Sequence, residues 1–297
     1  MLFVRRILGN GISVPPYIFS VSATKKVSFS PGNLQYQGST NSFRFAEHQW
    51  DVIGNAAGNT TSKSQRPTQS AWIDLFGWGT SGWNNGNYFY RPYDNSNSTS
   101  SPYTQATGYG YGPTDGTSYY ISLTGDYANS DWGVYNAIYN PNTESTDPAG
   151  TWRTLTSTEW IYVLTMRTTK SGVSYARATV NGICGLIIVP DNWRTSTYAL
   201  NDTNLEDSVF TSNIISANDW NGILEKAGCI FLPTTGYRYT STVTGVDSFG
   251  CYWSSTSELE YTGSYYLAFQ DGYLLPEYGT WRRYGMAVRL VRDYTPS

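Results

Sequence analysis

The stretch Gly250-Cys-Tyr-Trp-Ser-Ser-Thr256 opens the most informative part of this chain, which continues through Tyr265-Tyr-Leu-Ala-Phe269 to Met286-Ala-Val-Arg-Leu-Val-Arg292. In the last of these stretches, Met, Val and Leu alternate with Ala, Arg and Val. A period of two residues is typical of a strand with at least one buried face. We therefore expect strands at 251–255, 265–269 and 286–292.

Aromatic residues are unusually dense in this part of the chain. Between Tyr252 and Tyr284, 33 residues long, ten residues are aromatic, whereas Val, Ile and Leu are few. A core segment would carry more aliphatic residues, and a solvated loop would carry fewer rings. The mixture is typical of a recognition surface in which rigid aromatic anchors stand among small polar residues. Four aromatic residues in strand-like contexts are expected in the core instead: Tyr252, Trp253, Tyr266 and Phe269.

The composition of the whole chain bounds its function. Only 14% of the 297 residues are charged and the formal net charge is -3, so there is no basic excess to pair with a phosphate backbone, and we expect no nucleic-acid partner. Aromatic residues make up 16% of the chain, and 26 residues are tyrosine. This composition fits a contact surface. It fits equally well a largely β protein with Tyr- and Gly-rich loops.

Two helices and one hairpin have clear local signals. Thr156-Ser-Thr-Glu159 is a capping box that starts a helix, which we expect to run to about Arg167. Ser216-Ala-Asn-Asp219 repeats the device for a second helix that ends at Gly228. Between them, Asn181-Gly182 is the preferred residue pair for a type I′ turn between strands at 175–180 and 183–189.

The rest of the chain favours an α+β fold with short antiparallel sheets. Further short strands are expected at 27–29, 43–45 and 229–232, and few strands with two helices fit neither a sandwich nor a Rossmann fold. Residues 77–150 are rich in Gly, Asn, Ser, Tyr and Trp, which predicts a long structured insertion held by aromatic packing. Residues 1–24 form a separate arm or attachment segment, and the folded domain is expected at 25–297.

Few residues are suited to metal or nucleophilic chemistry. The single histidine, His48, has neighbours that match no metal spacing. Cys184, Cys229 and Cys251 lie far apart and lack CxxC spacing, which argues against a disulfide framework or a zinc site. One pair could form a disulfide, but we interpret all three as buried thiols. We therefore expect no metal and no cofactor.

The N-terminal sequence does not resemble a signal peptide, because Arg5 and Arg6 interrupt its apolar run. No window approaches the roughly 18 apolar residues of a membrane span. We therefore expect no membrane span. Together with cysteines that look reduced, this favours assembly in a cytoplasm.

Four motifs resemble a known family. The stretch Trp152-Arg-Thr-Leu-Thr-Ser-Thr-Glu-Trp160 resembles the first-helix signature of the formylglycine-generating-enzyme-like branch of the C-type lectin fold. The motifs at 250–256, 266–269 and 283–292 are similar to a paralogous domain family abundant in gut Bacteroidetes and to the variable proteins of diversity-generating retroelements in phages and bacteria. The resemblance covers residues 25–292. It implies a C-type lectin fold with two helices, short antiparallel sheets, long structured insertions and a variable-type surface at about 252–286.

The resemblance also implies which residues bind a ligand. In such proteins the positions between the framework residues of the C-terminal segment form a hypervariable binding face. Carried over to this chain, they are Ser257, Glu258, Glu260, Tyr261, Tyr265, Ala268, Gln270, Tyr273, Glu277, Tyr278, Trp281 and Tyr284.

The function implied is non-catalytic recognition of a host-surface protein or glycan by a phage-tail receptor-binding adhesin. Residues 1–24 would then dock to a virion or carrier protein, or mediate homo-oligomer formation, and the protein would be located in the virion or on a bacterial cell surface. A bacterial cell-surface adhesin and a calcium-independent glycan-binding lectin are the alternatives. A formylglycine-generating-type oxidase is more remote, because that chemistry needs a close cysteine pair and Cys251 has no cysteine near it in sequence. The Glu-Pro-Asn and Trp-Asn-Asp motifs of calcium-dependent lectins are absent from the sequence.

Overall fold

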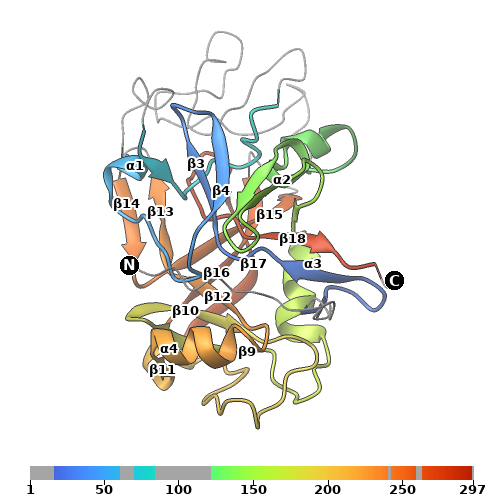
Figure 1. Cartoon of the computed structure of the whole chain (residues 1–297), viewed down its shortest axis with the longest axis vertical. Coiled ribbons are helices and arrows are strands. Elements are labelled where there is room, and N and C mark those ends of the chain that lie inside the picture. The colour runs from blue at the N-terminus through green and yellow to red at the C-terminus, as the bar shows by residue number, and fades with distance from the viewer. Residues whose placement is uncertain (1–16, 61–69, 84–121, 240–241, 259–262, 296–297) are drawn as a thin grey trace.

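Three long strands near the C-terminus form the central sheet of the molecule. The computed structural model describes residues 17–60, 70–83, 122–239, 242–258 and 263–295. Strands β15 (Gly250–Ser257), β16 (Gly263–Gln270) and β17 (Tyr273–Trp281) pair antiparallel in that order. In Figure 1 they lie between β3 and β4 above and β9, β10 and α4 below. The strands expected at 251–255 and 265–269 are confirmed.

The central sheet separates two hydrophobic cores, because successive side chains of a strand point to opposite faces. The first core contains Tyr252 and Phe269, and the second contains Cys251, Trp253 and Tyr266. Both faces of β15 and β16 are therefore buried. The dense aromatic residues of this part of the sequence serve first to fill these two cores.

The segment that follows the sheet differs from the single strand expected at 286–292. Only β18 (Leu290–Asp293) is a strand, whereas residues 285–287 form isolated bridges to three separate segments, at Arg238, Phe76 and Tyr252. Successive side chains of residues 286–291 do point to opposite sides, but both sides are buried. Met286, Val288 and Leu290 enter the second core, while Ala287 and Val291 enter the first. The expectation of one long strand was wrong because this segment changes its pairing partner at each residue.

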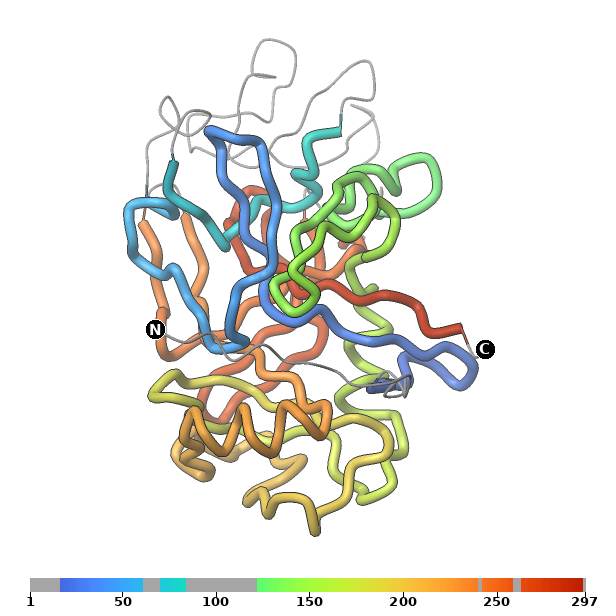
Figure 2. The backbone as a smooth tube through the Cα atoms, in the orientation of Figure 1, coloured from blue at the N-terminus to red at the C-terminus, as the bar shows by residue number. Residues whose placement is uncertain are grey.

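A second sheet brings the two ends of the described chain together (Figure 2). Its strand order is β1-β2-β18-β8, and β18 pairs with β2. The strands are β1 (Phe19–Ser20), β2 (Lys26–Phe29), β18 and β8 (Arg153–Thr154). Phe19 and Val21 are buried in the first core. The domain therefore begins no later than Tyr17, and the expected boundary at residue 24 is too late. Residues 1–16 lie outside the described residues.

A third sheet, in the order β5-β3-β4-β6-β7, packs on the second core. Its strands are β3 (Leu34–Gln37), β4 (Ser42–Phe45), β5 (Trp72–Ile73), β6 (Ile138–Asn140) and β7 (Ser145–Asp147). Three short helical turns accompany it: α1 (Ala57–Thr60), η3 (Gly125–Ser130) and α2 (Trp132–Tyr135). In the described parts of the expected insertion, Trp78 and Trp132 are fully buried. The remainder, 84–121, lies outside the described residues.

A fourth sheet forms the lower end of the molecule in Figure 1, with the order β11-β9-β10-β12. Its strands are β9 (Tyr175–Val180), β10 (Ile183–Ile188), β11 (Ile214–Ile215) and β12 (Ile230–Pro233). Asn181 and Gly182 have φ angles of 50° and 82°, as a type I′ turn requires. The expected hairpin is confirmed.

Both expected helices are present, and each begins as an α-helix and continues with π geometry. Helix α3 (Ser157–Ile161) runs into η4 (Tyr162–Met166), and the capping box at Thr156 and Glu159 is complete. Helix α4 (Ala217–Asp219) runs into η6 (Trp220–Leu224). The turns that follow end at Gly228, whose φ of +90° explains the glycine. The fold is thus α+β, with mostly small antiparallel sheets.

Candidate functional site

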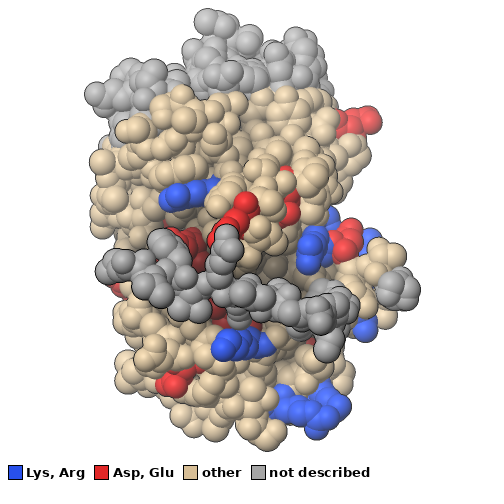
Figure 3. Space-filling view, viewed as in Figure 1, with Lys and Arg blue, Asp and Glu red and all other residues tan. Residues whose placement is uncertain are grey.

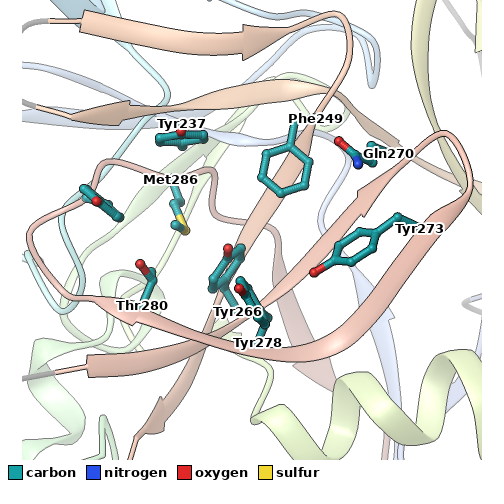
Figure 4. A pocket seen from close by; sticks show the side chains of 9 residues that line it. Tyr237, Phe249, Tyr266, Gln270, Tyr273, Tyr278, Thr280 and Met286 are labelled. Atoms are coloured by element: carbon teal, nitrogen blue, oxygen red, sulfur yellow. The ribbon is translucent and has the colours of Figure 1, made fainter. Parts of the chain in front are cut away.

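A pocket opens between the central sheet and a small hairpin, β13 (Thr235–Tyr239) and β14 (Thr242–Val246). Its volume is about 300 Å³, at the lower end of the range for small-molecule sites. In Figure 4, Tyr237 and Phe249 face Tyr266 and Tyr278 across the hollow. The described residues that line it are Tyr237, Phe249, Tyr266, Gln270, Tyr273, Tyr278, Thr280, Tyr284 and Met286.

One wall of the pocket rests directly on the second core. Tyr266 of β16 is the cross-strand partner of Tyr278 of β17, and their ring centroids are 5.6 Å apart in an edge-on arrangement. On its other side, Tyr266 packs edge-on against the fully buried Trp253 at 6.0 Å. The buried ring of Tyr266 therefore supports the exposed ring of Tyr278. Because this contact already restricts the Tyr278 side chain, little conformational entropy remains to be lost when a ligand binds.

The turn between β16 and β17 is held in place by Arg177 of the fourth sheet and by Ser208, which lies between β10 and β11. The Arg177 side chain of β9 donates from Nε to the Gln270 carbonyl oxygen at 2.7 Å. Next in the turn, the Gly272 N–H donates to the Ser208 carbonyl oxygen at 3.0 Å. The turn carries Gln270 and Tyr273 at the pocket edge, so these bonds position two of the lining side chains.

The opposite wall is a cluster of rings from β13 and from residues 281–284. Tyr237 contacts Phe249 at a centroid distance of 6.1 Å and Tyr284 at 5.8 Å. Tyr284 also contacts Tyr239 at 5.2 Å and Trp281 at 6.0 Å. We call Tyr239, Trp281 and Tyr284 the aromatic rim. It extends the pocket into a wider ring-lined surface.

The pocket lining is polar without being charged. The nine described lining residues include no Asp, Glu, Lys, Arg or His. Burial, reinforced by neighbouring phenols, raises the pKa of Tyr273 and of Tyr284 above the ordinary value of a phenol. Burial likewise raises the pKa of Tyr266. These phenols therefore act as neutral hydrogen-bond donors and acceptors beside apolar ring faces.

The structure gathers some of the sequence-predicted site residues and separates others. Four of them line the pocket: Gln270, Tyr273, Tyr278 and Tyr284. Trp281 is 46% exposed at the aromatic rim. Three more lie outside the lining and are at least partly exposed: Glu258, Tyr265 and Glu277. Glu260 and Tyr261 lie outside the described residues.

Two predicted surface positions are buried, which corrects their assignment. Ala268 is fully buried in the second core, where it lies opposite Cys251 across the strand pair. It shares this inward face with Tyr266, two residues earlier. Ser257 is also buried, and its N–H donates to the Ser122 hydroxyl at 3.1 Å. Neither side chain belongs to the exposed surface of the chain.

Sequence reasoning missed the part of the pocket that precedes residue 252, and also Thr280 and Met286. Tyr237 and Phe249 come from the β13 hairpin and its exit, outside the stretch that the resemblance singled out. The alternation Tyr237-Arg-Tyr239 was the available signal, since it places two rings on one face of a strand. Tyr266 was correctly expected to be buried, but its ring also lines the pocket.

The groups most suited to catalysis lie elsewhere or are buried. Burial raises the pKa of the Cys251 thiol well above its ordinary value, and Cys229 is shifted in the same direction. None of the three cysteines forms a disulfide. His48 stacks on Trp50 at 4.7 Å. Within the described ranges, no group of three or more His, Cys, Asp or Glu residues could hold a metal ion.

The outer surface adds two observations. On the face shown in Figure 3, basic and acidic side chains are scattered, with no continuous basic patch. Among the described helices, none is long and apolar enough to cross a membrane.

Comparisons with known proteins leave the site to be interpreted from its own geometry. No protein-family model, no curated protein and no solved structure matches this chain.

Proposed function

We propose that this chain is a non-catalytic ligand-binding protein with a C-type lectin fold, and that the pocket with its aromatic rim is its recognition site. One observation carries the proposal. Four positions assigned to binding by the resemblance, widely spaced between residues 270 and 284, converge on one uncharged, ring-lined pocket. Tyrosine supplies large contact area at low entropic cost, and its hydroxyl gives directional hydrogen bonds.

The geometry supports binding more than chemistry. A catalytic site needs a nucleophile or an acid–base pair within hydrogen-bonding reach of a substrate. The described lining residues are phenols, Phe249, Thr280, Gln270 and Met286, with no histidine, cysteine or carboxylate among them. The formylglycine-generating-type oxidase is disfavoured further because Cys251 is fully buried, and a buried thiol is inert.

The setting that best fits is a phage-tail receptor-binding adhesin that recognises a host-surface protein or glycan. A bacterial cell-surface adhesin would use the same site. A calcium-independent glycan-binding lectin is favoured by a specific feature, because phenols with exposed ring faces suit a sugar ring and its hydroxyls. Location in a virion or on a cell surface follows from these functions.

A binding assay on intact cells tests the proposal. Labelled protein is incubated with a panel of bacterial strains, and Tyr273→Ala is compared with Tyr139→Ala, which removes an exposed tyrosine on β6, outside the pocket lining. We expect Tyr273→Ala to lower binding at least tenfold and Tyr139→Ala to leave it unchanged. Equal binding by both variants, with unchanged circular dichroism, would contradict the proposal.

Attachment through the N-terminal segment is a separate part of the proposal. The apolar residues expected to need a partner are Leu2, Phe3, Val4, Ile7, Leu8, Ile12 and Val14. Because β1 belongs to the domain, the matching fragment should begin at Tyr17 and not at residue 25. Light scattering should show the full chain assembling and the 17–297 fragment remaining monomeric. Equal assembly of both would remove the segment from this role.

A further inference from the structure

One arginine, Arg283, lies against the aromatic rim. The guanidinium carbon of Arg283 is 4.0 Å from the ring centroid of Trp281 and 6.0 Å from that of Tyr239. Both rings contact Tyr284, which lines the pocket. Arg283 is thus held by stacking at the pocket edge, where a positive charge would meet an occupant of the pocket.

Unlike several other described arginines, Arg283 has no hydrogen-bond or ion-pair partner for its side chain among the described residues. Arg153 is paired with Glu159 and Asp293, and Arg167 is paired with Asp191. Within the part of the chain that the structure describes, Arg283 makes no hydrogen bond and no ion pair, and its Nε is buried without a partner. Stacking leaves the N–H edge of a guanidinium available for a planar anion, which it binds through two parallel hydrogen bonds.

The pocket beside it selects against several classes of ligand. A purely hydrocarbon ring would leave the phenols of Tyr266, Tyr273 and Tyr278 desolvated without partners, which costs free energy. A cationic ligand would be repelled by Arg283, and the described lining offers no carboxylate to offset that repulsion. A ligand ring that carries hydroxyls can pack against the tyrosine ring faces and form hydrogen bonds with the phenol groups. An anionic substituent on that ring would satisfy Arg283.

We propose that the pocket binds an acidic sugar residue, with its hydroxylated ring against Tyr273 and Tyr278 and its anionic group on Arg283. This inference rests on the proposed binding function and names the ligand class of the same site. The area of a single sugar in a pocket of about 300 Å³ predicts weak binding by one domain, which display in several copies would strengthen.

Saturation-transfer NMR on the full chain tests the ligand class with free sugars. Glucuronate, N-acetylneuraminate and glucose 6-sulfate are compared with glucose and N-acetylglucosamine at pH 7. The variants are Arg283→Gln, Tyr273→Ala and Arg292→Gln. Arg292 is the matched control, because it is an exposed arginine that also lies over a tryptophan, Trp152, at 5.5 Å, but has no contact with the pocket lining.

We expect at least one acidic sugar to bind tenfold or more tightly than its neutral counterpart. Arg283→Gln should abolish that preference, Tyr273→Ala should abolish binding, and Arg292→Gln should change neither. Which acidic sugar responds identifies the anion as a carboxylate or a sulfate. Equal binding of neutral and acidic sugars, or a preference that survives Arg283→Gln, would overturn the inference.

Failure of the inference can be told from failure of the proposed function. If no sugar binds, but Tyr273→Ala still loses binding to intact cells, then the acidic-sugar assignment is wrong and the recognition site stands. If cell binding is also insensitive to Tyr273→Ala, both are wrong.

Discussion

Strands β16 and β17 are neighbours in one sheet and both are rich in tyrosine, yet β16 belongs to the core and β17 to the surface. Tyr266 on β16 is 5% exposed, whereas its cross-strand partner Tyr278 on β17 is 47% exposed. Almost all of β16 is buried between two cores, whereas in β17 only Leu274 is buried and the other residues are partly or fully exposed. Residue type alone therefore does not assign a tyrosine to core or surface. The layer that covers the strand decides it.

Truncation of a buried aromatic side chain should lower the free energy of unfolding more than truncation of an exposed one. Trp253→Ala removes a fully buried ring that packs against Tyr266 and donates to the Phe76 carbonyl oxygen at 2.7 Å. We expect the free energy of unfolding to fall by about 3–5 kcal/mol, as for other buried large-to-small changes. Trp160→Ala and Trp220→Ala should behave alike, since both rings are fully buried. Urea unfolding measures all three, and a loss below about 1 kcal/mol would remove the residue from the core.

The core also carries carboxylates, which the described pocket lining does not. Burial raises the pKa of Asp74 and of Asp131 from 3.8 to about 6. A folded-state pKa above the unfolded value gives stability that is complete below pH 3.8 and is lost as the pH rises through about 6. The free energy of unfolding should therefore increase between pH 7.5 and pH 5, by on the order of 1–2 kcal/mol per carboxylate.

Urea unfolding at the two pH values measures this change, and Asp131→Asn should remove its own share of it. Ligand binding over the same range should vary much less, because the described lining has no group that titrates there. Stability that is flat or falls on acidification would contradict the burial of these carboxylates.

Truncation of an exposed aromatic side chain on β17 should change the free energy of unfolding only slightly. Trp281→Ala and Tyr278→Ala each remove a ring that is about half exposed. We expect the free energy of unfolding to change by less than about 1 kcal/mol, as is usual for surface substitutions. Thermal melts alongside Trp253→Ala provide the comparison. A loss of several kcal/mol at Trp281 would place it in the core and break the division between the two strands.

The smallest expected effect is that of a chelator. Because no described group of residues suits a metal ion, EDTA should change neither the melting temperature nor binding to cells. Loss of binding with an intact fold would shift the interpretation to a calcium-dependent lectin.

Local signals in the sequence were sufficient for the parts of the fold that depend on neighbouring residues. The capping box at Thr156 and the turn at Asn181-Gly182 follow from backbone geometry, so the sequence predicted them correctly. The burial of Ala268 and the broken strand at 285–287 depend on contacts with distant segments, which no local pattern encodes.

The pocket shows the same limit. Its β17 side was predicted from the motif, whereas Tyr237 and Phe249 arrive from a hairpin that precedes the motif in sequence. Their meeting with Tyr284 depends on β13, where the Arg238 N–H donates to the Gly285 carbonyl oxygen at 2.8 Å. Tertiary pairing of this kind could not be predicted from the sequence of either segment alone.

Photo-crosslinking tests the central claim most directly, because it asks which face of the molecule touches the target. A photoreactive phenylalanine analogue is placed at Tyr278 in the pocket, or at Tyr139 on β6 as the control. Both variants should fold and bind cells, since both positions are exposed. The account predicts that the target is crosslinked from position 278 and not from position 139. Crosslinking from position 139 alone, with cell binding retained, would contradict it.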